Sequence, residues 1–486
     1  MKKTAFVYDK WLSVLGGGEV VACNLAVTLR DLGYRTTFIT GQLIDPKIVL
    51  QKLGINMSGI DFIQAFNDDE KVKKITKDAD IFINASFYDY TQSKAKKQLY
   101  YASFPNIPQS KSIKAQLKSY FQKIISLIIN PVEKVNSHQY VFYFLKPQTI
   151  HHLKFTLTLS QFSKTVLSSL DYQIDNVKIL DQKVYINHFK NQANFDITII
   201  TNTNSLNINI ICPADCSITI NSPFLNPLFS KLNSFFRSGY YPNINTRVYS
   251  FDSVMANSQY TQKWIKKYWD TSSTILYPPV SLVKSIQKTI KKNQICSVGR
   301  FFTLGHGKKQ EIMIEAFKKL YDQGLKKWEL HLAGGLGSEP TSLAYAQKLK
   351  ELSQGYPIFL HFNESHQFIE NLYSESKIYW HAAGFGENSQ KDPIKFEHFG
   401  ITPIEAMYRG CVPVLFNGGG LSEVVKLLKL DSKFHLFNTI DELVANTQKI
   451  IDQNIKLPLN TSKQLESLFG LPRFQKQFKE RILNLK

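Results

Sequence analysis

The chain has 486 residues, of which 43% are hydrophobic and 20% are charged. At about 150 residues per domain this length predicts roughly three structural units, and it excludes a peptide hormone or a single small module. The composition is typical of a globular protein and excludes a chain that is disordered throughout. The 59 Lys and Arg residues against 39 Asp and Glu give a net charge of +20, which favours anionic partners such as phosphorylated molecules, nucleic acid or an acidic membrane surface.

The cysteines and the N-terminus indicate the compartment. Five scattered cysteines do not form the framework of a disulfide-stapled secreted protein, so a reducing, cytoplasmic compartment is expected. Asp9 and Lys10 interrupt the apolar run that starts at Ala5, which favours a first strand over a secretory leader. No run approaches the ~20 apolar residues that a membrane span needs.

The first hundred residues alternate short apolar runs with helical periodicity. A strand, a helix over 20–32 and a second strand follow one another, and this order implies a parallel sheet covered by helices. Strands are expected at 5–8, 36–40, 81–85 and 99–102.

The same rhythm returns in the last two hundred residues, with helices expected over 310–320 and 342–352. The sequence therefore predicts an α/β protein with two doubly wound halves. Pro278 and Pro279, with the basic stretch that runs to Asn293, are the natural linker. The strands of this second half are expected at 295–298, 328–333, 358–362, 377–380 and 412–416.

Between the halves the pattern changes. Apolar and polar residues alternate strictly at 154–159 and 206–210, so we expect an antiparallel β insertion over about 138–222. The resulting domains are an N-terminal one over 1–280, which contains the insertion, and a C-terminal one over 290–465.

The segment from Lys111 to Lys123 has apolar residues at helical spacing and lysines outside that stripe. Two interpretations stay open for this amphipathic helix: packing on its own domain, which is favoured, or docking on an anionic membrane surface.

The densest motif runs from Glu397 to Glu405. Thr402 and Pro403 suit the N-cap and first position of a helix, which would put Glu405 in the first turn, while Glu397 would lie on the loop before it. Carboxylates at the carboxyl edge of a parallel sheet can accept hydrogen bonds from hydroxyl groups, and the helix end attracts phosphate. The turn 418–420 opens the next helix and offers further backbone N–H groups.

The spacing Glu397-x7-Glu405, with His-Phe-Gly between and Gly-Gly-Leu-x-Glu downstream, resembles the retaining family 4 glycosyltransferases of the GT-B fold. The resemblance implies two Rossmann-like domains, with the donor nucleotide in the C-terminal one and a last helix over 466–486 that crosses back to the N-terminal domain. It also implies that Glu397 binds the donor sugar and that Glu405 binds the ribose. The other donor-binding residues that it implies are Phe399, Gly400, Gly418, Gly419, Gly420 and Leu421.

The resemblance extends to Arg300 and Lys308, which match the pair that clamps the donor diphosphate in this family. A guanidinium and an ammonium group suit the charge that develops on a leaving diphosphate. Lys308 fits the family spacing better, although its neighbour Lys309 stays open as an alternative.

In the N-terminal half the resemblance rests on Gly16, Gly17 and Gly18, which follow the first strand. They lack the G-x-G-x-x-G spacing of a dinucleotide fingerprint. They are either a loop that faces acceptor or phosphate, or a plain strand-to-helix turn. The pattern is most similar to the branch that contains dolichol-linked core mannosyltransferases and bacterial relatives. That branch commonly has His-Phe-Pro where this chain has Ser103, and a hydroxyl cannot carry positive charge or act as a base near neutral pH.

The resemblance implies transfer of a hexose, of mannose or glucose type, from a GDP- or UDP-linked sugar to a lipid-linked or polysaccharide acceptor, as in cell envelope polysaccharide biosynthesis. No cofactor or metal is expected, and the protein is expected to be cytoplasmic, with peripheral binding to the inner face of a membrane where the basic helix docks. The alternative, suggested by Ser103 and the insertion, is a catalytically impaired GT-B-like protein that binds glycans or sugar nucleotides. Nucleic acid is not expected as a partner, because the net positive charge is the only feature of the sequence that suggests it.

Overall fold

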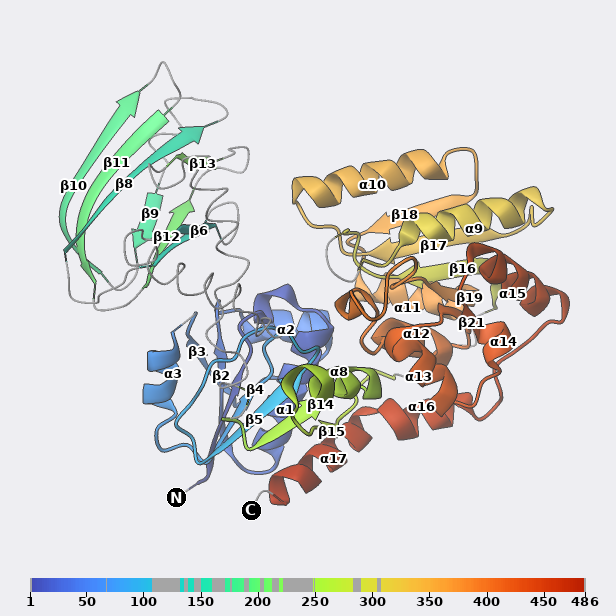
Figure 1. The fold of residues 1–486 in the computed structure, drawn as a ribbon, viewed down its shortest axis with the longest axis horizontal. Coiled ribbons are helices and arrows are strands. Elements are labelled where there is room, and N and C mark those ends of the chain that lie inside the picture. The colour runs from blue at the N-terminus through green and yellow to red at the C-terminus, as the bar shows by residue number, and fades with distance from the viewer. Residues whose placement is uncertain are drawn as a thin grey trace. The chain divides into compact units, whose positions relative to one another are not determined.

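The computed structural model describes residues 2–66, 68–106, 248, 250–282, 290–303 and 307–484, together with the backbone of eight strands between 132 and 221. The chain divides into two compact units (Figure 1). Unit 1 contains Met1–Pro108 and Asn243–Lys486, and unit 2 contains Gln109–Pro242. The predicted basic helix between Lys111 and Lys123 lies outside the described residues.

Unit 1 contains a first sheet of seven strands, all paired in parallel. Most residues of its central strands are apolar and buried, as a sheet covered on both sides requires. In spatial order the strands are β15 (Thr274–Ile275), β14 (Ser253–Ala256), β5 (Lys97–Ala102), β4 (Ile81–Asn84), β1 (Thr4–Tyr8), β2 (Arg35–Thr40) and β3 (Asp61–Gln64).

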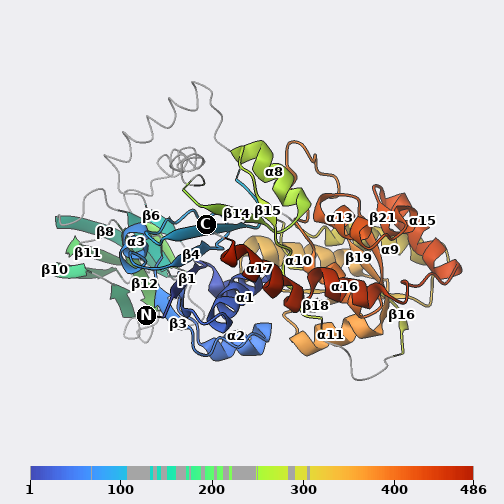
Figure 2. The same ribbon diagram turned by 90° about the horizontal axis from the view of Figure 1, so that it is seen from below.

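Helices cover both faces of this first sheet, namely α1 (Gly17–Asp31), α2 (Pro46–Leu53), α3 (Asp69–Ile75), α8 (Gln259–Trp269) and α17 (Leu471–Leu483). On one face Leu25 of α1 packs in the same cluster as Phe474 and Phe478 of α17, and Figure 2 shows these two helices beside each other. On the other face, Ile265 and Trp269 of α8 are buried. The last helix of the chain therefore belongs to the core of the first sheet.

A second sheet of six parallel strands lies in the C-terminal part of unit 1. In spatial order its strands are β18 (Ile358–Phe362), β17 (Glu329–Gly334), β16 (Lys292–Val298), β19 (Ser376–His381), β20 (Val412–Phe416) and β21 (Leu436–Phe437). Its helices are α9 (Gln310–Asp322), α10 (Pro340–Ser353), α11 (His366–Glu375), α12 (Ile401–Tyr408), α13 (Gly419–Leu427), α14 (Ser432–His435), α15 (Ile440–Asp452) and α16 (Thr461–Phe469).

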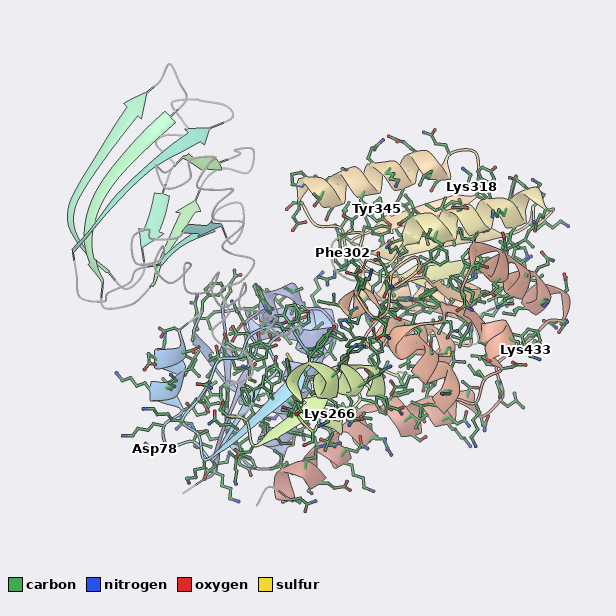
Figure 3. All side chains as sticks on the ribbon, in the orientation of Figure 1. Asp78, Lys266, Phe302, Lys318, Tyr345 and Lys433 are labelled. Atoms are coloured by element: carbon green, nitrogen blue, oxygen red, sulfur yellow. The ribbon has the colours of Figure 1, made fainter. Side chains whose placement is uncertain are left out.

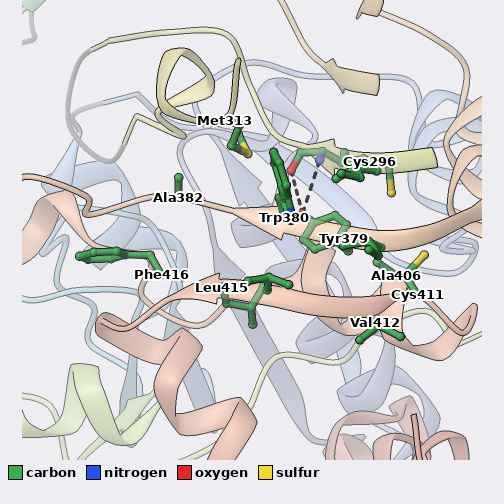
Figure 4. Close-up of a cluster of buried hydrophobic side chains, with 14 of the residues drawn as sticks. Cys296, Met313, Tyr379, Trp380, Ala382, Ala406, Cys411, Val412, Leu415 and Phe416 are labelled. Carbon is green, nitrogen blue, oxygen red and sulfur yellow. Dashed lines mark hydrogen bonds between the residues drawn. The ribbon is translucent and has the colours of Figure 1, made fainter. Parts of the chain in front are cut away.

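The second sheet has one continuous hydrophobic core. Figure 4 shows part of it, where Cys296 of β16, Tyr379 of β19 and Val412 of β20 come from neighbouring strands. The buried Tyr379 hydroxyl lies 3.3 Å from the carbonyl oxygen of Val298 and can donate to it. A satisfied polar group of this kind keeps the strand ends in register without leaving an unpaired donor in the core.

The described part of unit 2 forms two four-stranded antiparallel sheets. The alternating residues 154–159 and 206–210 both lie in its strands, so the predicted antiparallel insertion is confirmed. The strands are β6 (Val132–Lys134), β7 (Gln139–Tyr143), β8 (Ile150–Leu159), β9 (Asp171–Ile174), β10 (Val177–Asn187), β11 (Gln192–Thr201), β12 (Ser205–Ile211) and β13 (Ile218–Asn221).

Exposed lysines on outer helices, such as Lys266 on α8 and Lys433 on α14, carry part of the positive charge (Figure 3). Across the described ranges, no helix combines the length and the apolar character that crossing a membrane requires.

Candidate active site

The carboxyl edges of the two sheets of unit 1 face each other. Gly17, at the start of α1, is so close to the second sheet that a Cβ atom there would lie 3.0 Å from Ile401 Cδ1. The ring of Phe104, just after β5, stacks on His398 with 4.3 Å between centroids and 14° between planes. In open α/β sheets ligands bind at this edge, so the predicted site residues lie where a ligand is expected.

Glu397 is the centre of a small charged cluster. The ammonium group of Lys308 contacts Glu397 Oε2, and both side chains are 14% exposed. The Nε2 atom of His381 lies 3.0 Å from the same carboxylate oxygen. Because His381 Nδ1 accepts the Ala383 N–H at 3.3 Å, the ring proton is assigned to Nε2, which faces Glu397. Burial lowers the pKa of His381, so the ring is neutral and orients the carboxylate.

The two adjacent lysines point to different partners. The stem of Lys308 packs against Gly299, where a Cβ atom would lie 2.5 Å from Lys308 Cγ. Lys309 Nζ instead lies 2.7 Å from Glu387 Oε1, on the loop that follows β19. Of the two residues that the sequence leaves open, Lys308 therefore contacts Glu397.

Arg300 lies two residues after Val298, which is the last residue of β16, and its side chain is exposed. Its guanidinium carbon is 4.9 Å from the ring centroid of Phe302, which is labelled in Figure 3. The Gln310 amide donates to the carbonyl of Arg300 at 3.2 Å and holds this loop against α9. Arg300 and Lys308 thus lie near the two ends of the segment that connects β16 to α9.

The turn 418–420 packs directly on the backbone of Glu397, His398 and Phe399. The Gly420 N–H donates to the Glu397 carbonyl at 2.7 Å. A Cβ atom at Gly419, whose φ is +62°, would lie 2.2 Å from that same oxygen, and one at Gly420 would lie 2.5 Å from His398 O. Only glycine fits such an approach to backbone atoms, which explains Gly419 and Gly420.

Some of the backbone N–H groups that were predicted to bind phosphate already have partners in the protein. The Gly418 N–H donates to Phe416 O at 2.8 Å, and the Gly420 N–H is used by Glu397. The first amides of a helix have no partner within that helix. Gly419 and Leu421 are therefore the amides of the turn that we keep as candidates for binding phosphate.

Phe399 and Leu421 are buried core residues, 3% and 0% exposed. The Phe399 ring stacks on Tyr277 with 5.6 Å between centroids, and Leu421 faces Gly400. Their side chains are packed inside the protein, so contacts to a donor would come from their backbones.

The helix that carries Glu405 begins earlier than predicted. Its N-cap is Gly400, with φ +99°, and not Thr402. The Thr402 hydroxyl is used elsewhere, because it accepts from Tyr379 at 2.8 Å and lies 3.2 Å from Val298 O. The predicted N-cap is therefore wrong, and Glu405 lies in the second turn of α12.

Glu405 is held by its neighbours on α11. The Tyr373 hydroxyl donates to Glu405 Oε2 at 3.3 Å. Burial, together with the charge of Glu370, raises the pKa of Glu405 to about 7, although Tyr373 and Arg409 act to lower it. Glu370 and Arg409 form an ion pair. A carboxyl group with this pKa can exchange its proton near neutral pH.

At the start of α1, the Gly16 N–H donates to Glu19 Oε2 at 2.6 Å. The positive charge of Arg300 lowers the pKa of Glu19, although burial raises it more. Gly18 has open space around it. Ser103 follows β5, and its carbonyl accepts from the Thr261 hydroxyl at 3.1 Å.

Sequence reasoning did not assign four residues that the structure brings to this region. His381 lies in a segment that fits the resemblance, with a core histidine as the open alternative, and Glu19 follows the glycine turn. Glu387 and Glu423 lie in segments whose sequence gives no direct signal of their partners, although Glu423 ends the Gly-Gly-Leu-x-Glu motif. Among the described residues, no group of three or more His, Cys, Asp or Glu residues could hold a metal ion. Metal independence stays a prediction.

Two facing parallel α/β sheets define the fold of GT-B glycosyltransferases. The solved structure of a glycosyltransferase from Rickettsia africae is similar over 99% of both chains, with a TM-score of 0.54 and 13% identity. Anabaena HepE, solved with UDP-glucose, is similar over 99% of this chain and all of its own, with a TM-score of 0.52 and 13% identity. The predicted fold class is confirmed.

Residues 282–466 match the family described as Glycosyl transferases group 1, so this segment is similar to the glycosyltransferases of that family. A Xenopus laevis GDP-Man:Man(3)GlcNAc(2)-PP-Dol alpha-1,2-mannosyltransferase is 27% identical over 35% of this chain and 35% of its own. An alpha-1,3/1,6-mannosyltransferase of Candida glabrata is 26% identical over 48% of this chain and 59% of its own. The matches thus span between a third and three fifths of these relatives. The resemblance seen in the motifs is confirmed.

Proposed function

We propose that the protein is a retaining family 4 glycosyltransferase that moves a hexose from a nucleotide diphosphate sugar to a lipid-linked or polysaccharide acceptor. The observation that supports this most is the arrangement around Glu397. Its carboxylate is oriented by Lys308 and the neutral His381, next to a glycine turn and at the carboxyl edge of the donor-side sheet.

In this proposal Arg300 and Lys308 bind the diphosphate. When the donor binds, the Lys308 ammonium group would either leave Glu397 for the diphosphate or contact both groups. An ammonium group has three N–H donors, and the diphosphate carries more negative charge than the carboxylate. The amides of Gly419 and Leu421 at the start of α13 would add hydrogen bonds to the same group. Glu397, freed on one side, accepts hydrogen bonds from hydroxyl groups of the hexose.

Glu405 is proposed to bind the two ribose hydroxyls, since an ionised carboxylate can accept from both. Gly400 and Phe399 shape the floor between the two glutamates, through backbone atoms. Gly16, Gly17 and Gly18 form the opposite wall with Ser103, where the acceptor would enter.

The proposed reaction breaks the bond between the anomeric carbon and the diphosphate oxygen. The acceptor hydroxyl oxygen attacks the same face, and its proton passes to the departing diphosphate, so the configuration is retained. The positive charges of Arg300 and Lys308 stabilise the leaving group without a metal.

The sugar is proposed to be mannose or glucose. Both curated relatives are named mannosyltransferases, and one carries GDP-mannose in its name. HepE was solved with UDP-glucose, so both nucleotide classes are kept in the donor panel.

The test is release of nucleoside diphosphate from GDP- and UDP-linked mannose and glucose, with and without oligosaccharide or polyprenyl-linked acceptors. Proton NMR of the product reports the anomeric configuration. We expect one donor to be consumed faster with acceptor present, and an α-linked product from an α-linked donor. An inverted product contradicts the proposed mechanism.

The second candidate is a protein that binds a sugar nucleotide without transferring it. Ser103 favours it, because the related branch commonly has a histidine there. Donor binding without turnover across the whole acceptor panel, restored by Ser103→His, would support this candidate over the first.

Peripheral membrane binding through the predicted helix between Lys111 and Lys123 is proposed on the charge pattern of that segment alone. Co-sedimentation with phosphatidylglycerol vesicles, compared with phosphatidylcholine vesicles, tests it. Binding to the anionic vesicles that high salt does not weaken contradicts an electrostatic contribution.

A further inference from the structure

The start of α8 lies between the two sheets of unit 1. Ser258 is its N-cap, and the Ser258 hydroxyl accepts the Thr261 N–H at 3.0 Å. The same hydroxyl donates at 2.6 Å to the carbonyl of His398, on the segment next to Glu397. A helix that belongs to the acceptor-side sheet thus begins on the donor-side motif.

Glu423 of α13 completes this contact. Its Oε1 accepts the Gln259 N–H at 3.0 Å, and its Oε2 accepts the Tyr260 N–H at 3.2 Å. The Tyr277 hydroxyl, at the beginning of the linker, donates to Oε1 at 2.7 Å. Three donors from the N-terminal part of the chain therefore converge on one carboxylate of the C-terminal part.

The environment makes this contact strong. Glu423 is 9% exposed, and hydrogen bonds to a charged group are shorter and stronger than neutral ones. The first amides of α8 carry the positive end of the helix dipole, which favours a carboxylate there. Removal of the carboxylate would take away the partner of two part-buried N–H groups, those of Gln259 and Tyr260.

The contact also connects the two sides of the site. The hydroxyl of Thr261, in the first turn of α8, donates to the carbonyl of Ser103. Glu423 lies one turn after Gly419 and Gly420, which pack on the Glu397 backbone. The first turn of α8 therefore contacts Ser103, and the first turn of α13 connects Glu423 to the glycines that pack on Glu397. Glu423 joins these two turns.

We propose that Glu423 is a positioning residue that fixes the acceptor-side wall at Ser103 relative to the donor-side carboxylate Glu397. It touches neither substrate. It sets the distance across which the acceptor hydroxyl must reach the anomeric carbon, and a displacement of about 1 Å there can cost about 100-fold in rate. This inference rests on the proposed function for its kinetic part.

The test uses the full chain with Glu423→Ala and Glu423→Gln. Glutamine keeps one acceptor oxygen, so its effect should lie between those of alanine and the wild type. The matched control is Glu466→Ala, because Glu466 also accepts from a tyrosine hydroxyl, that of Tyr408 at 2.6 Å, but does so within the C-terminal part.

Two readouts are measured. Hydrogen exchange of the Gln259 and Tyr260 amides reports the contact itself, and we expect at least tenfold faster exchange in Glu423→Ala. Nucleoside diphosphate release at fixed acceptor reports catalysis, and we expect kcat to fall at least tenfold while the donor KM stays within twofold. Glu466→Ala should change neither.

Unchanged amide exchange in Glu423→Ala overturns the contact. Faster exchange with unchanged kcat overturns its role in positioning, and a donor KM that rises as kcat falls assigns Glu423 to the donor site instead. If the wild type transfers no sugar, the proposed function fails. In that case the inference is decided by hydrogen exchange of the backbone amides between residues 103 and 106. This exchange must also be faster in Glu423→Ala than in the wild type.

Discussion

The N–H group of Gly420 donates to the carbonyl oxygen of Glu397 across 2.7 Å. This bond joins the loop before α12 to the turn before α13, so the two densest parts of the sequence motif form one rigid piece. The geometry around it explains why glycines occur at 419 and 420, and it holds the Glu397 backbone while Lys308 and His381 hold its carboxylate.

Gly419→Ala should destabilise the protein. The added Cβ would lie 2.2 Å from Glu397 O, and φ at this position is +62°. We expect a loss of roughly 1–3 kcal/mol from the clash and about as much again from backbone strain. Chemical denaturation measures this. Gly18→Ala, which meets open space within helix α1, is the control and should be neutral or slightly stabilising. Equal effects of the two variants would contradict the packing described.

Lys308→Ala should lower kcat by about 100- to 1,000-fold, the range seen when one group that stabilises developing negative charge is removed. Lys309→Ala is the matched neighbour, and it should lower kcat much less, because Lys309 pairs with Glu387. Steady-state kinetics on both variants checks this. A larger loss in Lys309→Ala would reverse the assignment.

Glu405 should make stability depend on pH. Its pKa is about 7 in the folded chain, against 4.5 as its ordinary value, because it is buried beside Glu370, with Tyr373 and Arg409 also facing it. The folded state therefore binds this proton more tightly than the unfolded state. The contribution of Glu405 to stability is fully present below about pH 4.5 and is lost as pH rises toward 7.

The measurement is the difference in unfolding free energy between wild type and Glu405→Gln from pH 5 to pH 8. The wild type should lose stability relative to the variant as pH increases. A difference that is constant with pH contradicts the raised pKa.

The last helix, α17, should contribute to the stability of the first sheet and its helices. Phe478 is fully buried beside α1, so Phe478→Ala should cost about 3–5 kcal/mol. Leu483, 70% exposed on the same helix, is the control, and its replacement by alanine should cost less than about 0.5 kcal/mol. Similar midpoints in urea for the two variants would contradict the packing of α17.

Much of the fold could be predicted because buried parallel strands have continuous apolar runs. The run at 412–416 coincides with β20, which is buried along its whole length. The strands that were missed are short or partly polar, such as β3 (Asp61–Gln64), whose side chains are half-buried or exposed. Periodicity gives no signal at such an edge strand, because its pairing is fixed by β2 and not by its own composition.

Residue spacing pointed to two pairs, Arg300 with Lys308 and Glu397 with Glu405, because the members of each pair are only eight positions apart in sequence, and their roles stay predictions. It could not identify the contacts of Glu423, since its partners at Gln259 and Tyr277 are more than 140 residues away in sequence. The helix start at Gly400 was missed for a similar reason. Thr402 is a good N-cap in isolation, but Tyr379 and Val298 engage its hydroxyl.

The central claim is that this site binds a nucleotide diphosphate sugar, and donor-dependent thermal stabilisation tests it most directly. A ligand that binds only the native state at 100 times its Kd adds about 2.7 kcal/mol to stability. We predict that at least one of GDP-mannose, GDP-glucose, UDP-mannose and UDP-glucose raises the Tm of the wild type, and that Glu405→Ala removes the shift. No shift with any of the four, or an equal shift in Glu405→Ala, would contradict the account.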